Sequence, residues 1–442
     1  MNKFLTWSAA LGLTTVLTLT AAAQGVGIGT STPHPSAALD ITSTTGGLAL
    51  PRLTTAQRQA IANPTLGMLV VQTDGEFGIY HAYNGAWFNL MNGQQPNNYG
   101  FLASSATNGG AVTLLSGSGS APSPSTADPS GTATTATYAS NVQQLAVDRD
   151  GNLYMSVNRF VMKITPAGVS SIFAGTTSLA LGYADGPATA GAQFGDYLPA
   201  LALDRDQNVY VFDGNNRVIR KITQAGVVST VAGTVGVDGS TNGTGVGNAT
   251  FKLFTLGLAF DPSGNLYALE SPTHTIRRIT PGGTVSLWSG TLNTSGSGDG
   301  PLSSATYNQP YALAFDIYGT GYVADRGNNT IRRIDANGTV STLAGLAGSS
   351  GLVDGAGTTA RFATPNSVTI ATNGDLIVGM NHAVRRVTTS GTVSTVAGIL
   401  TSGFFYGTST TTRFNRPYGV GVNRAGWIYL FDSLNSRLVV IK

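Results

Sequence analysis

The sequence predicts an all-β protein in which residues 111–442 form a six-bladed β-propeller, closed by an N-terminal strand and preceded by a small, mostly-β N-terminal module. Three observations lead to this fold class. The composition disfavours helices, one strand phrase recurs about every 55 residues, and the repeat markers begin out of step with one another.

The composition excludes several classes of protein. The chain of 442 residues holds 58 glycines and only two glutamates, Glu76 and Glu270, and such a composition is unsuited to a mainly helical fold. Cysteine is missing, which excludes a disulfide scaffold, a thiol nucleophile and a cysteine-ligated zinc site. The formal charge is only +3 and the arginines are dispersed, so we expect no nucleic-acid partner.

Residues 1–23 have the pattern of a signal peptide. A basic start at Lys3 precedes an apolar stretch, and Ala21–Ala23 supplies the small side chains that a signal peptidase accepts. The stretch from Phe4 to Leu19 is shorter than the roughly 20 apolar residues that a membrane span needs. We therefore expect an exported protein, in the periplasm, at the cell surface or outside the cell, with no membrane span after cleavage.

Residues 24–91 predict a separate N-terminal module, joined to the propeller by a linker over residues 92–110. Thr54 and Gln57 have the spacing of a capping box and predict a short helix. The segment resembles N-terminal modules of exported Bacteroidetes proteins, and its opening, GVGIGT, resembles that of trimeric fibre-type proteins. This resemblance implies a homotrimer.

The repeat consists of four strands, and three markers recur six times each. The first strand ends at Asp148, Asp204, Asp261, Asp316, Ala371 and Asn423. The fourth strand closes on Gly117, Gly175, Gly233, Gly290, Gly345 and Gly398. A small-x-aromatic marker ends at Tyr138, Phe194, Phe251, Tyr307, Phe362 and Phe414, which we expect to pack over apolar blade edges.

The offset between the markers predicts how the ring closes. The first copy of the fourth strand lies before the first complete repeat. The last repeat, in turn, has only its first three strands before the sequence ends. Pairing Ala111–Leu115 with Arg437–Ile441 would complete six four-stranded sheets and leave no open edge.

The repeated runs resemble those of NHL-repeat propellers, in the longer bacterial variant. The runs GNLY (151–154 and 264–267) and YVADRGNNTIRRI (322–334) carry the resemblance. It implies a secreted or surface propeller that is used mostly for binding, although some NHL-like propellers are amidating lyases or lactonases.

The loops predict which face binds. Turns after the first and third strands are short, whereas those after the second and fourth strands are longer and variable; we call these the short-turn face and the long-loop face. Insertions gathered on one face often mark the binding face. We therefore expect a mouth on the long-loop face, with candidate binding residues Tyr183, Asp213, Glu270, Asp325, Phe404, Phe405, Tyr406 and Asp432.

The four acidic residues of this set have two interpretations. As a broken ring of carboxylates they could hold calcium. As strand-end residues they could bond turn amides and pair with an arginine seven positions later, Arg220, Arg277 or Arg332, and this structural interpretation is favoured. The acidic row at Asp148, Asp204, Asp261 and Asp316 lies on the short-turn face and is expected to be structural.

A metal-dependent enzyme is the alternative. His274 and His382 share one register in non-adjacent blades, and Glu270 could act as a third ligand for zinc. No nucleophile–base pair stands out. The sequence thus favours an exported, non-catalytic propeller, without a cofactor, whose long-loop face binds a glycan, peptide or protein; the alternative is a metal-dependent lyase or lactonase.

Overall fold

The computed structural model describes the chain in separate stretches. In the N-terminal part these are residues 26–28, 39–41, 48–61, 64, 68–74, 78–83 and 86–89. In the C-terminal part they are residues 112–118, 136, 138, 144–175, 181–408 and 411–442. The predicted signal peptide and the predicted linker lie outside these residues.

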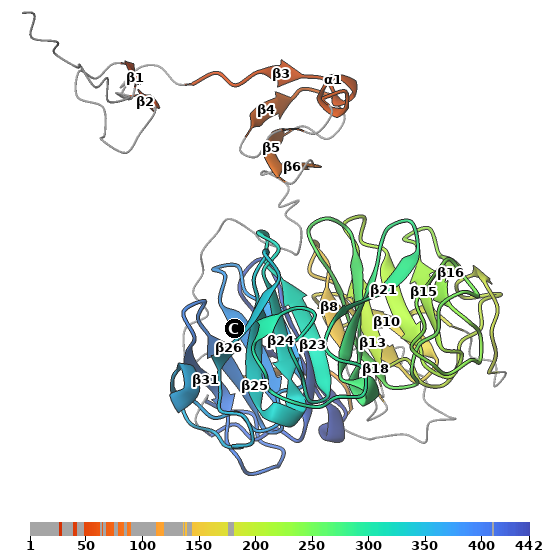
Figure 1. Cartoon of the computed structure of the whole chain (residues 1–442), viewed down its shortest axis with the longest axis vertical. Coiled ribbons are helices and arrows are strands. Elements are labelled where there is room, and N and C mark those ends of the chain that lie inside the picture. Colours follow the sequence, from red (N-terminus) through yellow and green to blue (C-terminus); the bar gives the residue numbers. More distant parts are fainter. Residues whose placement is uncertain are drawn as a thin grey trace, which may run out of the picture.

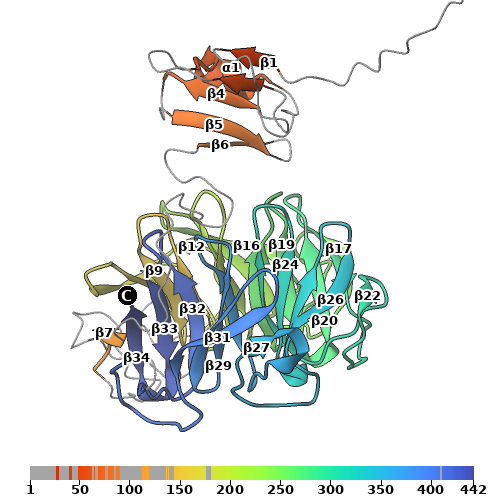
Figure 2. The same ribbon diagram turned by 90° about the vertical axis from the view of Figure 1, so that its left-hand side faces the viewer.

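The N-terminal module contains short strands and one helix (Figures 1 and 2). Strands β1 (Val26–Ile28) and β2 (Leu39–Ile41) form a parallel pair. A second sheet has the order β3-β4-β5-β6. Its strands are β3 (Arg52–Leu53), β4 (Leu69–Gln72), β5 (Gly78–Tyr83) and β6 (Ala86–Asn89). The helix α1 (Thr55–Gln59) follows β3 in the chain. The predicted capping box is confirmed, since Gln57 N donates to Thr54 Oγ1 and Thr54 N donates to Gln57 Oε1.

Within the described residues, six antiparallel sheets follow, numbered here 1 to 6 and given from the innermost strand outward. Sheet 1 holds β8 (Leu145–Val147), β9 (Leu153–Val157), β10 (Phe160–Ile164) and β11 (Ser170–Ala174). Sheet 2 holds β13 (Ala200–Leu203), β14 (Val209–Asp213), β15 (Val218–Ile222), β16 (Val227–Gly233) and β12 (Gly186–Pro187). Sheet 3 holds β18 (Thr255–Phe260), β19 (Leu266–Glu270), β20 (Thr275–Ile279), β21 (Thr284–Ser289) and β17 (Gly243–Thr244).

The remaining three sheets repeat this pattern. Sheet 4 holds β23 (Pro310–Phe315), β24 (Gly321–Asp325), β25 (Thr330–Ile334), β26 (Thr339–Ala344) and β22 (Gly300–Pro301). Sheet 5 holds β28 (Ser367–Ile370), β29 (Leu376–Met380), β30 (Ala383–Val387), β31 (Thr392–Gly398) and β27 (Gly355–Ala356). Sheet 6 holds β32 (Pro417–Val422), β33 (Ile428–Asp432), β34 (Arg437–Ile441) and β7 (Val112–Ser116). Single-turn 3₁₀ helices are η1 (Ser271–Thr273), η2 (Arg326–Asn328), η3 (Gly357–Thr359) and η4 (Ser433–Asn435).

The sheets form a propeller-like ring (Figures 1 and 2). Their innermost strands contact one another in the order β8, β13, β18, β23, β28 and β32, and β32 in turn contacts β8. In sheet 6 the outer strand β7 pairs antiparallel with β34, with Val112 opposite Ile441 and Leu114 opposite Val439. The all-β class expected from the sequence is confirmed. No helix of the described residues is long and apolar enough to cross a membrane.

The core lies between neighbouring sheets and repeats with them. Six hydrophobic clusters fill the ring, and each contains one of the aromatic residues of the small-x-aromatic marker. All six rings are at most 2% exposed, as the repeat predicts: Tyr138, Phe194, Phe251, Tyr307, Phe362 and Phe414.

The short-turn face is held by the acidic residues that end the first strands. Asp148 accepts hydrogen bonds from the backbone N–H groups of Asp150 and Asn152, at 2.9 and 2.8 Å. Asp261 accepts equivalent bonds from its own turn and a further bond from Tyr267 Oη, at 3.0 Å. The structural interpretation of this acidic row is confirmed.

Candidate functional site

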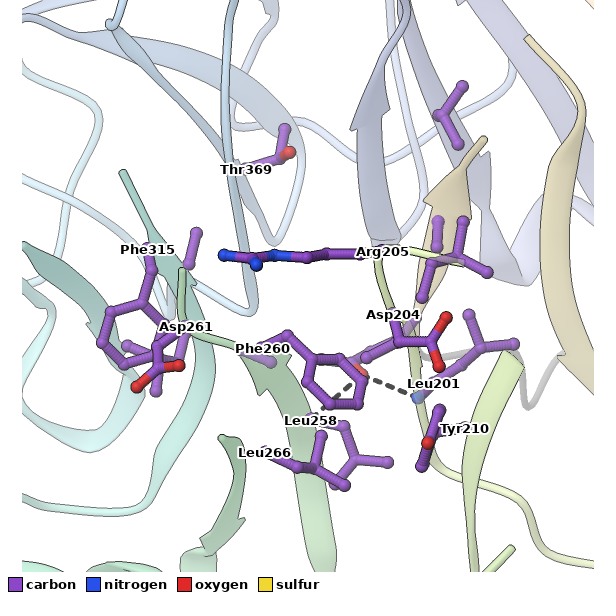
Figure 3. A pocket seen from close by; sticks show the side chains of 18 of the residues that line it. Leu201, Asp204, Arg205, Tyr210, Leu258, Phe260, Asp261, Leu266, Phe315 and Thr369 are labelled. Atoms are coloured by element: carbon purple, nitrogen blue, oxygen red, sulfur yellow. Dashed lines mark hydrogen bonds between the residues drawn. The ribbon is translucent and has the colours of Figure 1, made fainter. Parts of the chain in front are cut away.

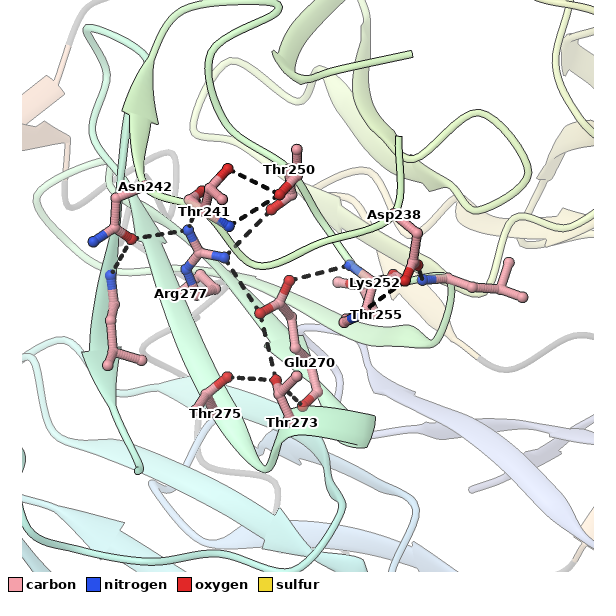
Figure 4. Close-up of polar contacts among 12 residues, drawn as sticks. Asp238, Thr241, Asn242, Thr250, Lys252, Thr255, Glu270, Thr273, Thr275 and Arg277 are labelled. Atoms are coloured by element: carbon pink, nitrogen blue, oxygen red, sulfur yellow. Dashed lines mark hydrogen bonds and ion pairs between the residues drawn. The ribbon is translucent and has the colours of Figure 1, made fainter. Parts of the chain in front are cut away.

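A buried arginine organises the outer part of four sheets. In sheet 3, Arg277 from β20 is 1% exposed and reaches Glu270 Oε2 at 3.3 Å (Figure 4). The same guanidinium donates to Asn242 Oδ1 at 3.0 Å and to the carbonyl oxygen of Thr241 at 2.8 Å. It also lies over the Phe251 ring, 5.8 Å from the centroid. The side chain thus ties the end of the second strand to the long loop that covers its sheet.

Equivalent arginines repeat this arrangement. Arg220 and Arg332 each pair with a buried strand-end aspartate, Asp213 at 3.3 Å and Asp325 at 3.0 Å. The pairing at a spacing of seven residues, expected from the sequence, is confirmed. In sheet 5, Met380 stands in place of the acid, and Arg385 pairs with the loop residue Asp354 at 2.7 Å.

The four strand-end acids lie inside the sheets and not on an open mouth. Asp213, Glu270, Asp325 and Asp432 are all 0% exposed. Each accepts a backbone N–H of the segment that leads into its innermost strand; Asn308 N, for example, donates to Asp325 at 2.8 Å. Burial raises the pKa of all four carboxyls, to about 6 for Asp325 and Asp432. The structure thus places these candidate binding residues inside the sheets, where their oxygens accept hydrogen bonds from loop amides, asparagines and arginines.

Each candidate metal ligand interacts with a different partner elsewhere in the fold. His274 caps η1 in the left-handed conformation, and its Nδ1 accepts a hydrogen bond from Gln309 N at 3.0 Å. Burial lowers the pKa of His274. His382 Nδ1 lies 3.3 Å from the carbonyl oxygen of Phe414, and Glu270 is paired with Arg277. Across the described residues, no three His, Asp or Glu side chains form a group that could hold a metal ion.

The candidate aromatic residues divide into two kinds. Tyr183 lies over Arg220, 4.9 Å from its guanidinium carbon, and Tyr406 Oη donates to Asp432 at 2.9 Å, so both complete the polar networks of their sheets. Phe404 and Phe405 are instead 53% and 54% exposed. Among the candidate aromatic residues, these two are the ones more than half exposed, and they lie next to each other in the return loop before sheet 6.

A cavity of about 670 Å³ occupies the axis of the ring (Figure 3). The innermost strands of all six sheets line it, mostly with aliphatic side chains such as Leu201, Leu258 and Val420. The cavity reaches the turns after the first strands, including residues 204–207, and therefore opens on the short-turn face. We call it the axial channel. Trp87 of β6 borders the same opening.

Aromatic rings occupy the opposite end of the axis. Tyr311 and Tyr418 are stacked with centroids 6.2 Å apart, and Tyr197 meets Phe254 edge to face at 6.0 Å. Burial raises the pKa of Tyr311, and the nearby Tyr418 and Tyr197 add to the rise, so rings from three sheets converge there. None of these four rings is among the residues that line the axial channel.

Polar and charged residues also line the axial channel, among them Gln144, Arg149, Asp204, Arg205, Asp206, Lys221 and Asp261. Gln144 Oε1 accepts from Leu201 N at 2.9 Å and Leu258 N at 3.4 Å, which joins sheets 1, 2 and 3 near the axis. Arg205 extends across the opening between Thr369 and Phe260 (Figure 3). Burial lowers the pKa of Arg205, and Asp261 and Asp206 oppose that shift. The sequence did not reveal this site, because the short turns were expected to be structural only.

Comparisons with known proteins agree with this architecture. Residues 27–108 match the family described as a phage tail like trimerisation region. A protein of unknown function from Bacteroides thetaiotaomicron has a similar fold, with a TM-score of 0.55 and 17% identity, covering 84% of this chain and 82% of its own. An auxiliary nutrient binding protein from Bacteroides ovatus has a TM-score of 0.54 at 20% identity, covering 76% of each chain.

A mouse protein, Teneurin-3, is 28% identical over 220 residues, which are 44% of this chain. The aligned part spans only 8% of the length of that relative. Together, these similarities place the C-terminal part among propeller-like proteins.

Proposed function

We propose that this protein is an exported, non-catalytic binding protein whose axial channel takes a small ligand. The observation that carries the proposal is the channel itself, a 670 Å³ cavity lined by all six innermost strands. Its size falls within the range of roughly 300–1,000 Å³ typical of small-molecule sites. Its lining combines aliphatic residues of the innermost strands with charged residues of the short turns. The acidic side chains that suggested chemistry on the other face are committed to the sheets.

The proposal includes a six-bladed propeller of the NHL type, closed by β7. The six sheets, the contact between β32 and β8, and the pairing of β7 with β34 support it. The recurring GNLY and RRI runs support the NHL assignment.

We further propose that residues 1–23 direct export and that residues 24–91 trimerise the mature chain. The match of residues 27–108 to a trimerisation region supports the trimer. A trimer would present three channels on one particle and would raise avidity for a ligand displayed on a surface.

Filling the channel tests the proposed function. Thr369 lies on β28 at the opening, and a Thr369→Trp substitution would place an indole in the path of a ligand (Figure 3). The uncharged dye N-phenyl-1-naphthylamine brightens in apolar sites and reports occupancy. The mature chain (residues 24–442) should bind it, and Thr369→Trp should weaken binding at least tenfold. Equal binding by both proteins would contradict the proposal.

The exposed pair on the long-loop face supports a second candidate function, contact with a glycan, peptide or protein. Phe404 and Phe405 are adjacent and more than half exposed, as rings that anchor a partner would be. Glycan and peptide arrays probed with the mature chain and with Phe405→Ala test it. Retention of every array signal by the variant would argue against this surface.

The metal-dependent lyase or lactonase remains the alternative, and metal content distinguishes it. The mature chain, purified without chelator, should hold far less than one zinc or calcium ion per chain if the binding proposal is right. A stoichiometric ion would favour the enzyme.

A further inference from the structure

The turns after the first strands can be aligned position by position across the six sheets. The residue at the second turn position differs between sheets. In five of the six turns an Asp or Asn ends the first strand, whereas sheet 5 has Ala371 there, and one residue follows at the second position of each turn. That next residue is arginine in three sheets: Arg149 in sheet 1, Arg205 in sheet 2 and Arg424 in sheet 6. The equivalent residues in the other three sheets are uncharged, namely Pro262, Ile317 and Thr372.

The three arginines lie on one side of the ring. Sheets 6, 1 and 2 are consecutive neighbours, because β32 contacts β8 and β8 contacts β13. Arg149 and Arg205 line the channel opening. Burial lowers the pKa of Arg424 and the positive charge of Arg149 lowers it further, whereas the nearby Asp150 and Asp148 oppose the shift. We call the three residues the arginine arc.

The carboxylates next to the arc are mostly occupied. Asp148 accepts three hydrogen bonds from its own turn, and Asp204 accepts two from Asn208 and lies 3.7 Å from Lys221. In sheet 6 the turn is held by the neutral Asn423, whose Oδ1 accepts from Ala425 N and Trp427 N. Asp150 and Asp206 are exposed. Asp206 and Asp261 lie near Arg205, and Asp150 and Asp148 lie near Arg424, so these carboxylates partly balance the arc. The side chain that projects over the channel is nevertheless the cation Arg205 (Figure 3).

From this juxtaposition we infer that the channel takes a small amphipathic anion, with its apolar body among the innermost strands and its oxyanion on the arginine arc. This inference rests on the proposed function and specifies the ligand class. A guanidinium offers five N–H donors in a planar fork that matches a carboxylate or a similar oxyanion. At the mouth of the axial channel, such a charged hydrogen bond is stronger than in bulk water.

A matched pair of dyes tests the inference. The probes are 8-anilinonaphthalene-1-sulfonate and N-phenyl-1-naphthylamine, which share one aromatic body and differ by the sulfonate. The mature wild-type chain should bind the sulfonate dye about tenfold more tightly than the uncharged dye, as one charged hydrogen bond would provide. Fluorescence titrations of both dyes give the ratio of the two affinities.

Variants of the arginine arc test whether its residues cause the preference for the sulfonate dye. Arg205→Gln should lower the ratio of the sulfonate-dye affinity to the uncharged-dye affinity from about ten toward one. Arg205→Lys should retain part of the preference, and Asp206→Asn should increase it. Arg413→Gln removes an exposed arginine of the long-loop face and should leave both affinities unchanged. Unfolding curves must show that each variant remains folded.

Two results would overturn the inference. One is equal affinity of the wild type for both dyes. The other is an Arg205→Gln variant whose affinities for the two dyes fall by the same factor. The Thr369→Trp variant distinguishes failure of the anion inference from failure of the proposed channel binding. If Thr369→Trp weakens both dyes while Arg205→Gln leaves their ratio unchanged, the channel binds ligands but the arc does not select anions. If Thr369→Trp affects neither dye, the channel is not the site.

Discussion

Gly421 of sheet 6 lies directly against Val147 of sheet 1, at the point where the last innermost strand meets the first. A Cβ atom on Gly421 would come within 2.5 Å of Val147 Cγ2 and 2.6 Å of Leu145 Cδ2. The two strands therefore approach more closely than any larger residue would allow. This contact lies on the channel side of sheets 6 and 1, whereas β7 pairs with β34 at the outer edge of sheet 6.

Gly421→Ala should destabilise the fold by about 1–3 kcal/mol, the usual effect of overpacking a tight contact. Urea unfolding measures it. Gly282→Ala is the control, because the atom nearest to its added Cβ would lie 3.9 Å away. Equal stability of the two variants would show that the contact between sheets 6 and 1 is loose.

The buried arginines should differ in their contribution to stability. Arg277→Met leaves the fully buried Glu270 without its cation and should cost about 3–5 kcal/mol at neutral pH. Arg385→Met is matched in register but faces Met380, and its carboxylate partner Asp354 is half exposed. Arg385→Met should therefore lower the free energy of unfolding clearly less than Arg277→Met does. Urea unfolding of both variants checks the order, and a larger loss in Arg385→Met would contradict it.

The strand-end carboxylates should make stability depend on pH. Burial raises the pKa of Asp432 to about 6, above its ordinary value of 3.8, so the folded state binds the proton more tightly than the unfolded state. The stabilisation from that proton is complete below about pH 4 and is lost as the pH rises through about 6. The free energy of unfolding of Asp432→Asn, relative to wild type, should thus rise between pH 4 and pH 7, by on the order of 2 kcal/mol. A difference that stays constant over this range would contradict the assignment.

The mature chain should be a trimer. Light scattering coupled to size exclusion should give three times the chain mass at micromolar concentration, because residues 27–108 match a trimerisation region. A monomer over the whole concentration range would remove the trimer from the proposed function.

Much of the fold was predictable because it repeats. The six aromatic residues of the small-x-aromatic marker, the turn aspartates such as Asp148, and the spacing of Glu270 and Arg277 are local patterns whose physical role is the same in each copy. Repetition also made the offset of β7 visible. Thr54 and Gln57 were predictable for the same reason, since a capping box depends only on nearby residues.

The candidate site was less predictable because it depends on the ring as a whole. The sequence could not show that Glu270 and Asp325 would be fully buried, since their burial depends on long loops that fold over them. Nor could it show the size of the axial channel, which depends on the innermost strands of all six sheets. Arg149, Arg205 and Arg424 did offer a signal. They share one turn position, and their significance follows only once sheets 6, 1 and 2 are known to be neighbours.

The most direct measurement is a crystal structure of the mature chain with 8-anilinonaphthalene-1-sulfonate. The proposed function predicts dye density within the axial channel, with the aromatic body near Phe260 and Thr369 and the sulfonate at Arg205. An empty channel, with dye bound only at Phe404 and Phe405 on the long-loop face, would contradict it.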